Sequence, residues 1–179
     1  MEIPSDLAPA LLPVAWLLGR WEGAGVVGYP TIESANFGQE IEVTQDGRPF
    51  LRWTSRSWLL DDDGNQVRPL ATEAGFWRVF PAPADGPVDG QDGRPAPVSS
   101  VELLLSHPTG YVEIYLGTAE GAQINLQTDV VARTETAKEY SAATRIYGLV
   151  GGDLLWAMDM AAVGHPLTSH ASAQLKRAG

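Results

Sequence analysis

Residues 40–57 read EIEVTQDGRPFLRWTSRS, two stretches of alternating side chains on either side of an Asp-Gly pair. In the first stretch Ile41 and Val43 alternate with polar residues, and the second stretch continues the pattern. A period of two is typical of a strand with one face in the core. Asp46-Gly47 is a strong hairpin signal, because glycine accepts the positive φ of a tight turn. The stretch therefore predicts two antiparallel strands joined by a turn.

The same combination of alternating runs and turn signals recurs along the whole chain. Counting the runs predicts ten strands: 19–27, 36–45, 48–58, 70–80, 99–105, 111–118, 122–130, 136–148, 153–160 and 168–177. Short strands with short connections favour an antiparallel meander, and closure of a ten-stranded sheet removes its exposed edges. The predicted fold class is all-β, a single closed antiparallel β-barrel of about ten strands, in one domain over residues 1–179.

Only the N-terminus has a helical pattern. Ser5 is predicted to cap a short helix that starts near Asp6 or Leu7, and Pro13 to begin a second turn that reaches Leu17. Short helices at this position are expected to plug one end of the barrel.

Segment 81–97 departs from the strand pattern. Its five prolines, three glycines and three aspartates in 17 residues offer neither strand pairing nor burial. It is predicted to be a mobile hairpin loop, with a lid over a site as the alternative.

Composition excludes several classes of protein. The net charge is −10 and the only basic cluster is Lys176-Arg177, too small to neutralise nucleic-acid phosphates or an anionic membrane surface. No cysteine is present for a disulfide, a thiolate nucleophile or a thiolate metal ligand. The apolar run Leu7–Leu18 is interrupted by Pro13 and does not have the pattern of a signal peptide or membrane span. A cytoplasmic location is expected.

Three histidines are candidates for chemistry. His107 and His165 stand beside proline or glycine in predicted turns, whereas His170 lies inside a predicted strand. Histidine is the usual nitrogen ligand of haem iron. The alternative for His170 is an ordinary strand histidine with one hydrogen bond. Simple alternation places Ala171 inward and His170 outward, so the pattern by itself leaves the two interpretations open.

Two motifs add to this. Residues 19–25 have the pattern G-x-W-x-G-x-G, with Tyr29-Pro30-Thr31 soon after, and residues 170–177 have the pattern H-x-x-A-x-L-x-R. Together they resemble the signatures of the nitrobindin family, in its actinobacterial, fatty-acid-binding-protein-like branch, over about Leu17 to Arg177. That family consists of small ten-stranded β-barrels that hold haem b through one histidine of the last strand.

The resemblance implies roles for individual residues. His170 matches the proximal iron ligand, and Thr31 and Lys138 match residues that contact the haem. The alternatives are a turn-closing hydroxyl for Thr31 and a solvated strand lysine for Lys138. Many family members have a second histidine in the pattern P-[LM]-H-x-E-x-G, where this chain has Ala71.

The glycines of the first motif are expected to mark the fold rather than to act in chemistry. Gly23 and Gly25 share a strand face with Trp21 and allow close approach of another backbone or a flat ligand. Trp21 is expected to be buried with a partner for its indole N–H. Gly19 completes the motif.

The resemblance implies a haem b protein that isomerises peroxynitrite to nitrate and binds nitric oxide at the ferric iron, with no catalytic protein residue beyond the iron. The rival is a non-catalytic carrier of a small hydrophobic ligand such as a fatty acid. Ala71 and the outward parity of His170 favour the carrier, whereas the presence of Thr31, Lys138 and His170 favours haem. Peroxynitrite and nitric oxide are the expected small-molecule partners. The sequence does not decide between a monomer and a homodimer.

Overall fold

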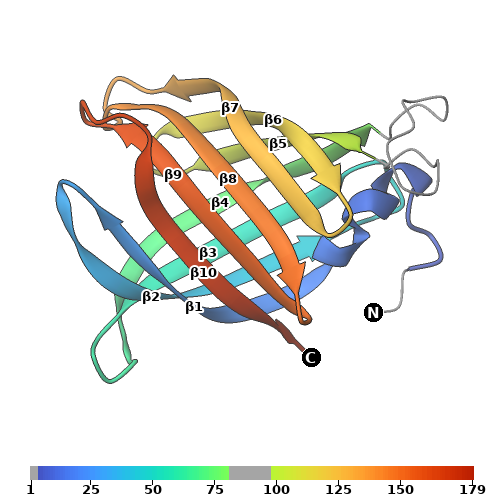
Figure 1. The fold of residues 1–179 in the computed structure, drawn as a ribbon, viewed down its shortest axis with the longest axis horizontal. Coiled ribbons are helices and arrows are strands. Elements are labelled where there is room, and N and C mark those ends of the chain that lie inside the picture. The colour runs from blue at the N-terminus through green and yellow to red at the C-terminus, as the bar shows by residue number, and fades with distance from the viewer. Residues whose placement is uncertain (1–3, 81–97) are drawn as a thin grey trace, which may run out of the picture.

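A computed structural model describes residues 4–80 and 98–179 and contains ten antiparallel strands in one closed barrel (Figure 1). Each strand pairs with its neighbours in the chain, and β1 pairs with β10 to close the sheet. The predicted all-β barrel is confirmed. The strands are β1 (Gly19–Tyr29), β2 (Ile32–Thr44), β3 (Leu51–Leu60), β4 (Gln66–Phe80), β5 (Ser99–His107), β6 (Tyr111–Glu120), β7 (Gln123–Arg133), β8 (Tyr140–Val150), β9 (Asp153–Ala162) and β10 (Thr168–Ala178).

The two ends of the barrel differ. Because the strands run up and down in turn, alternate connections gather at the same end. One end carries the N-terminal helix (Figure 1) and is called the closed end. The opposite end, called the open end, carries the connections β1–β2, β3–β4, β5–β6, β7–β8 and β9–β10.

The helix at the closed end is a single 3-10 helix, η1 (Pro9–Leu17). The prediction of a helix capped by Ser5 was wrong: Ala8 precedes η1, and no side chain caps it. Leu11 and Leu17 are fully buried, and η1 packs against β4 and β6. In residues 4–80 and 98–179 no helix is long and apolar enough to cross a membrane.

The first motif, residues 19–25, links η1 to β1 and β10, the two strands that close the barrel. The indole N–H of Trp21 donates to the carbonyl oxygen of Leu17 at 2.8 Å, and the guanidinium of Arg177 lies 4.1 Å from the centre of the Trp21 ring system. A Cβ at Gly23 or Gly25 would collide with the backbone of β10. The predicted close approach at these glycines is therefore confirmed, and its partner is the last strand.

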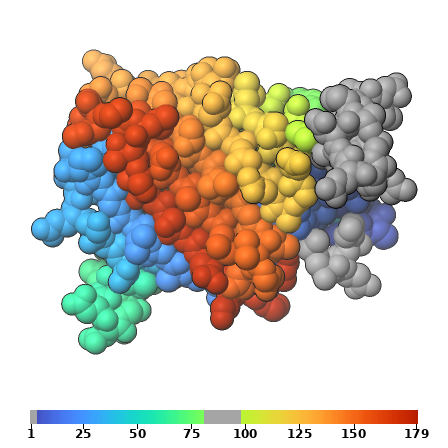
Figure 2. All heavy atoms as spheres, in the orientation of Figure 1, coloured from blue at the N-terminus to red at the C-terminus, as the bar shows by residue number. Residues whose placement is uncertain are grey.

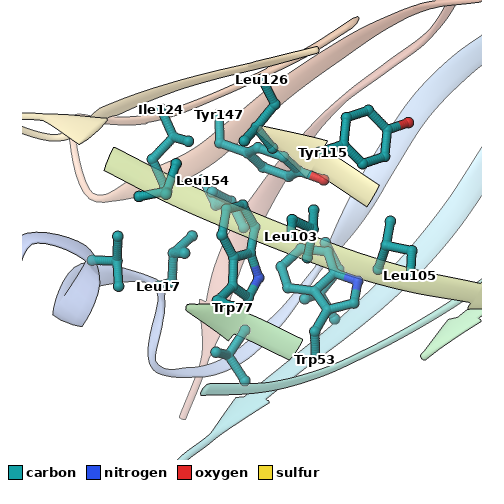
Figure 3. Close-up of a cluster of buried hydrophobic side chains, with 14 of the residues drawn as sticks. Leu17, Trp53, Trp77, Leu103, Leu105, Tyr115, Ile124, Leu126, Tyr147 and Leu154 are labelled. Carbon is teal, nitrogen blue, oxygen red and sulfur yellow. The ribbon is translucent and has the colours of Figure 1, made fainter. Parts of the chain in front are cut away.

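Large aromatic side chains fill the closed half of the barrel. Trp53, Trp77 and Tyr147 are fully buried and meet edge to face, with ring centroids 5.5–5.8 Å apart. Figure 3 shows them among leucines and Ile124, with Leu17 of η1 beside them. Such packing leaves no room for a bulky ligand in this half.

Most strand ends lie within a few residues of their predicted positions, and one difference concerns a site residue. β8 begins at Tyr140, four residues after the predicted start at 136, so Lys138 lies in the β7–β8 turn and not in a strand. The predicted mobile loop 81–97 lies outside the described residues.

Candidate functional site at the open end

The interior of the open end is accessible to solvent. Ala71, Glu73, Gly75 and Trp77 share one face of β4, because β4 pairs with β3 without a register shift over these residues. Trp77 is fully buried, yet Ala71 is exposed. Half-buried apolar residues contribute to this part of the barrel: Leu59, Tyr111, Val131, Met160 and Ala171. The barrel is therefore packed near η1 and accessible to solvent near the open end.

His170 stands at this end, at an irregularity of β10. Ser169 pairs with Asp159 and Ala171 pairs with Met158, so His170 is an extra residue in the ladder. Such a bulge re-aims a side chain and interrupts the alternation that fixes its face. The outward orientation predicted by simple alternation therefore does not apply to His170, although Ala173 and Leu175 are buried as that alternation requires.

The imidazole of His170 is oriented by the end of β1. Its Nδ1 lies 3.0 Å from the carbonyl oxygen of Gly28, and since a carbonyl only accepts, Nδ1 carries the proton and Nε2 keeps a free lone pair. The ring also meets the edge of buried Tyr29, with ring centroids 5.7 Å apart. Burial lowers the pKa of His170, which favours the neutral, metal-binding form.

Tyr29 is itself held firmly. Its hydroxyl lies 3.1 Å and 3.2 Å from the carbonyl oxygens of Met160 and Ala162, and it accepts from the Ala162 amide at 2.9 Å. The ring edge of His165 also packs on Tyr29. His165 lies in the β9–β10 loop, as predicted.

Thr31 and Lys138 lie in two turns of the same end. Thr31 is in the β1–β2 turn and Lys138 in the β7–β8 turn, and both are exposed. The β7–β8 turn meets the β9–β10 loop, where the amide of Val163 donates to the carbonyl oxygen of Glu139 at 3.3 Å. The fold thus places Thr31, Lys138 and His170 at one end, on three different connections or strands.

His107 differs from its prediction as a turn residue. It is the last residue of β5, its side chain is 5% exposed, and its Nε2 lies 2.7 Å from Oε2 of Glu113. Its ring stacks on Tyr111 with centroids 4.1 Å apart. β5 is five strands from β10 in either direction around the barrel, so His107 and His170 stand on opposite walls.

His107 belongs to a buried charged network that sequence reasoning missed. Arg145 forms a bidentate ion pair with Glu73, with Nη2–Oε1 and Nη1–Oε2 distances of 2.6 and 3.1 Å. Its Nε and Nη1 contact the hydroxyls of Tyr115 and Tyr147 at 3.1 and 3.2 Å. Arg145 is the one buried Lys or Arg in the part of the chain that the structure describes.

Glu113 is the second carboxylate of this network and lies 3.8 Å from Arg145. It accepts hydrogen bonds from His107, from Tyr115 at 2.6 Å and from Tyr140. Burial alone raises the pKa of Glu113, but the hydrogen bond from His107 and the charge of Arg145 outweigh burial and lower it to about 2. The alternation did contain a signal, because Glu113 shares a strand face with Tyr111 and Tyr115.

Two hollows on the outside of the barrel are separate from this end. One is lined by β6–β9 and the other by β1 and β7–β10, and the outer surface of β7–β10 crosses the face shown in Figure 2. No three His, Cys, Asp or Glu side chains within residues 4–80 and 98–179 are grouped as metal ligands. Among the three histidines, His170 is the one whose Nδ1 is bonded to a backbone carbonyl at the open end, which leaves its Nε2 available as a ligand.

Comparison with known proteins gives the same family over nearly the whole chain. Residues 10–177 match the model of the THAP4-like, heme-binding beta-barrel domain. A ferric nitrobindin-like protein of Kineococcus radiotolerans is 51% identical over 179 residues, which cover 99% of this chain and 98% of that protein. A peroxynitrite isomerase of Nocardioides sp. is 49% identical, with 98% of each chain covered.

The fold has a counterpart among solved structures. The crystal structure of Rv2717c from M. tuberculosis matches with a TM-score of 0.78 and 35% identity, covering 97% of this chain and 100% of that one. A single family model spanning nearly the whole barrel, with relatives of about half-identical sequence, determines the membership. The chain belongs to the nitrobindin family of haem-binding β-barrels.

Proposed function

We propose that this chain binds haem b at the open end of the barrel through His170 and isomerises peroxynitrite to nitrate. The observation that carries the proposal is the hydrogen bond from Nδ1 of His170 to Gly28, which leaves Nε2 free as a ligand beside an accessible interior. Metal-bound histidines commonly donate their other ring N–H to a carbonyl in this way. The name of the Kineococcus relative, a ferric nitrobindin-like protein, supports haem binding, and the name of the Nocardioides relative, a peroxynitrite isomerase, supports the reaction.

The residues of the open end fit a haem. A haem has a wide apolar ring and two carboxylates, and the end combines half-buried apolar residues with exposed Lys138 on a turn. Lys138 would pair with a propionate in a charge-assisted contact. Thr31 would offer a hydroxyl at the rim, and Ala71 leaves space where many family members carry a histidine.

When bound, ferric haem would supply the Lewis-acid centre for the rearrangement of peroxynitrite and for binding nitric oxide. The protein contributes position and environment. His170 would hold the iron through Nε2, and Gly28 fixes the tautomer of His170. Tyr29, anchored on β9, keeps the imidazole plane in place. No side chain is required to donate or accept a proton.

The rival function, a carrier of a fatty acid without chemistry, is disfavoured by the interior charges. A buried carboxylate head group needs a cation as partner. The buried cation Arg145 already pairs with Glu73 and contacts Glu113. The closed half is filled by Trp53 and Trp77, which leaves an acyl chain no interior path toward η1.

Haemin titration followed by the Soret band tests the proposal. His170→Ala should abolish the Soret shift, while His165→Ala, a second histidine at the same end on Tyr29, should keep it. Stopped-flow decay of peroxynitrite should accelerate with haem-loaded wild type and not with the His170→Ala protein. Undiminished haem binding by His170→Ala would contradict the proposed ligand and favour the carrier.

A cytoplasmic location and a homodimer complete the proposal at a finer level. The sequence has no cysteine that could form a disulfide in an oxidising compartment, which supports a cytoplasmic location. Cell fractionation and sedimentation at several protein concentrations test the two statements separately.

A further inference from the structure

A line of redox-active side chains, bridged at one point by Arg145, crosses the interior of the barrel. It begins with Trp77 and Trp53, whose ring centroids lie 5.8 Å apart. Tyr147 meets both, at 5.5 and 5.7 Å. Figure 3 shows these rings and Tyr115 gathered in one part of the interior. Electron transfer falls off steeply with distance, so side chains in contact are the ones that exchange electrons readily.

The line continues to the open end through hydrogen bonds and ring contacts. Arg145 joins the hydroxyls of Tyr147 and Tyr115, and the hydroxyls of Tyr115 and Tyr140 lie 3.4 Å apart. The ring of Tyr140 then meets that of Tyr111 with centroids 5.0 Å apart. Tyr111 is half-buried, so it is within reach of molecules in solution.

The line contains a proton acceptor at the place where tyrosine oxidation needs one. A buried tyrosine loses an electron readily only if its phenol proton leaves at the same time. Burial raises the pKa of both Tyr115 and Tyr140, so neither is ionised beforehand. Both hydroxyls donate to the carboxylate of Glu113, which is ionised above about pH 2.

We propose that this line, from Trp77 to Tyr111, is a second function of the protein: it reduces one-electron oxidants of the nitrogen dioxide class at the open end. In the step, Tyr140 gives one electron, across the contacting ring of Tyr111, to the nitrogen dioxide radical, which becomes nitrite, and the phenol proton of Tyr140 moves to Glu113. The products are a neutral tyrosyl radical, nitrite and protonated Glu113. A soluble one-electron reductant of the thiolate or ascorbate class then restores Tyr140, which regains its proton from Glu113.

The inference rests on the proposed function for the identity of the oxidant only. Four of the five tyrosines stand on the line. The fifth, Tyr29, is equally buried, but its hydroxyl contacts backbone atoms of β9 and no carboxylate. The chain thus provides its own control, a buried tyrosine without the proton acceptor.

Pulse radiolysis of the full chain without added haemin tests the line directly, and a haemin-loaded series follows. Azidyl radicals oxidise tryptophan, and the tryptophanyl absorbance should convert to a tyrosyl signal at a rate independent of protein concentration. Glu113→Gln should slow the conversion by about 10²-fold, the effect of losing a positioned proton acceptor. Tyr140→Phe should lower the tyrosyl yield, whereas in the series without haemin Tyr29→Phe should leave the conversion rate and the tyrosyl yield unchanged.

Two further measurements keep the test decisive if Glu113→Gln folds poorly. In the first, the Trp53→Phe/Trp77→Phe protein should lose the conversion of tryptophanyl to tyrosyl signal that is independent of protein concentration. In the second, nitrogen dioxide radical should produce a tyrosyl signal in wild type and a smaller one in Tyr140→Phe. A rate proportional to protein concentration, or an unchanged rate and yield in Tyr115→Phe/Tyr140→Phe, would overturn the proposal. Because these series need no haem, their failure is distinguishable from a failure of haem binding.

Discussion

The closed and open ends of this barrel are built by the same ten strands but are filled differently. At the closed end, Trp21, Trp53 and Trp77 pack beneath η1 and leave no space. At the open end, Ala71 occupies the same face of β4 as Trp77, and its side chain is exposed. Side-chain volume along one strand face therefore separates a core from a binding site, while the backbone stays the same.

The buried charges lie between these two ends. Arg145, Glu73 and Glu113 satisfy one another and the surrounding tyrosines, so polar groups stand inside the barrel without unpaired charge. Function at the open end is thus supported by a network that contacts no ligand in the proposal for haem.

The largest expected effect is at the closed end. Trp77→Ala should lower the free energy of unfolding by about 3–5 kcal/mol, because it removes a fully buried indole from the aromatic cluster. Phe76→Ala is the matched control, since Phe76 is the preceding residue of β4 and is 47% exposed on the outer face. Urea unfolding measures both, and equal losses would refute a packed core beneath η1.

The buried charges of Arg145, Glu73 and Glu113 predict that the stability of the protein depends on pH in acid. The pKa of Glu113 falls from 4.5 to about 2 on folding, so its stabilisation is complete above pH 4.5 and disappears as the pH falls toward 2. The contribution is roughly 3 kcal/mol at neutral pH. Unfolding free energies of wild type should fall across this window, and those of Glu113→Gln should fall less. Parallel pH profiles of the two proteins would contradict the prediction.

A pair of matched substitutions compares the two ends directly. Ala119→Leu enlarges a residue that is 1% exposed near the closed end, and should cost about 1–3 kcal/mol through overpacking. Ala71→Leu enlarges a solvent-exposed residue at the open end, and should leave stability unchanged while weakening haemin binding. If Ala71→Leu destabilised the protein as much as Ala119→Leu, the interior of the open end would be packed and not accessible to solvent.

Alternation and turn signals were sufficient to predict the barrel. Asp46-Gly47 and the runs beside it form a hairpin as expected, because one buried face per strand requires the period of two. The bulge at His170 could not be predicted, since an unpaired residue depends on the register of β9 against β10. Arg145 was missed because a charged residue on an interior face is stable only with partners that come from distant strands.

The site residues, too, could be predicted only in part from the sequence. The family resemblance implied His170, Thr31 and Lys138 as a set, and the fold places all three at one end of the barrel. The resemblance does not give the local geometry of these residues, and Lys138 lies in a turn and not in a strand. Its interaction with a haem propionate stays a prediction.

The smallest expected effect concerns Lys138. Its side chain is exposed, and only its carbonyl oxygen, which accepts from Arg133 at 2.9 Å, is held in the turn. An exposed charge pair contributes at most about 1 kcal/mol, so Lys138→Ala should weaken haemin binding by no more than about fivefold and more at low than at high salt. Lys176→Ala is the matched control, since Lys176 is the other lysine of the chain and lies near the far end of β10. Haemin titrations at two salt concentrations measure both variants. Equal effects of the two substitutions would show that net charge, and not a contact at the open end, attracts the haem.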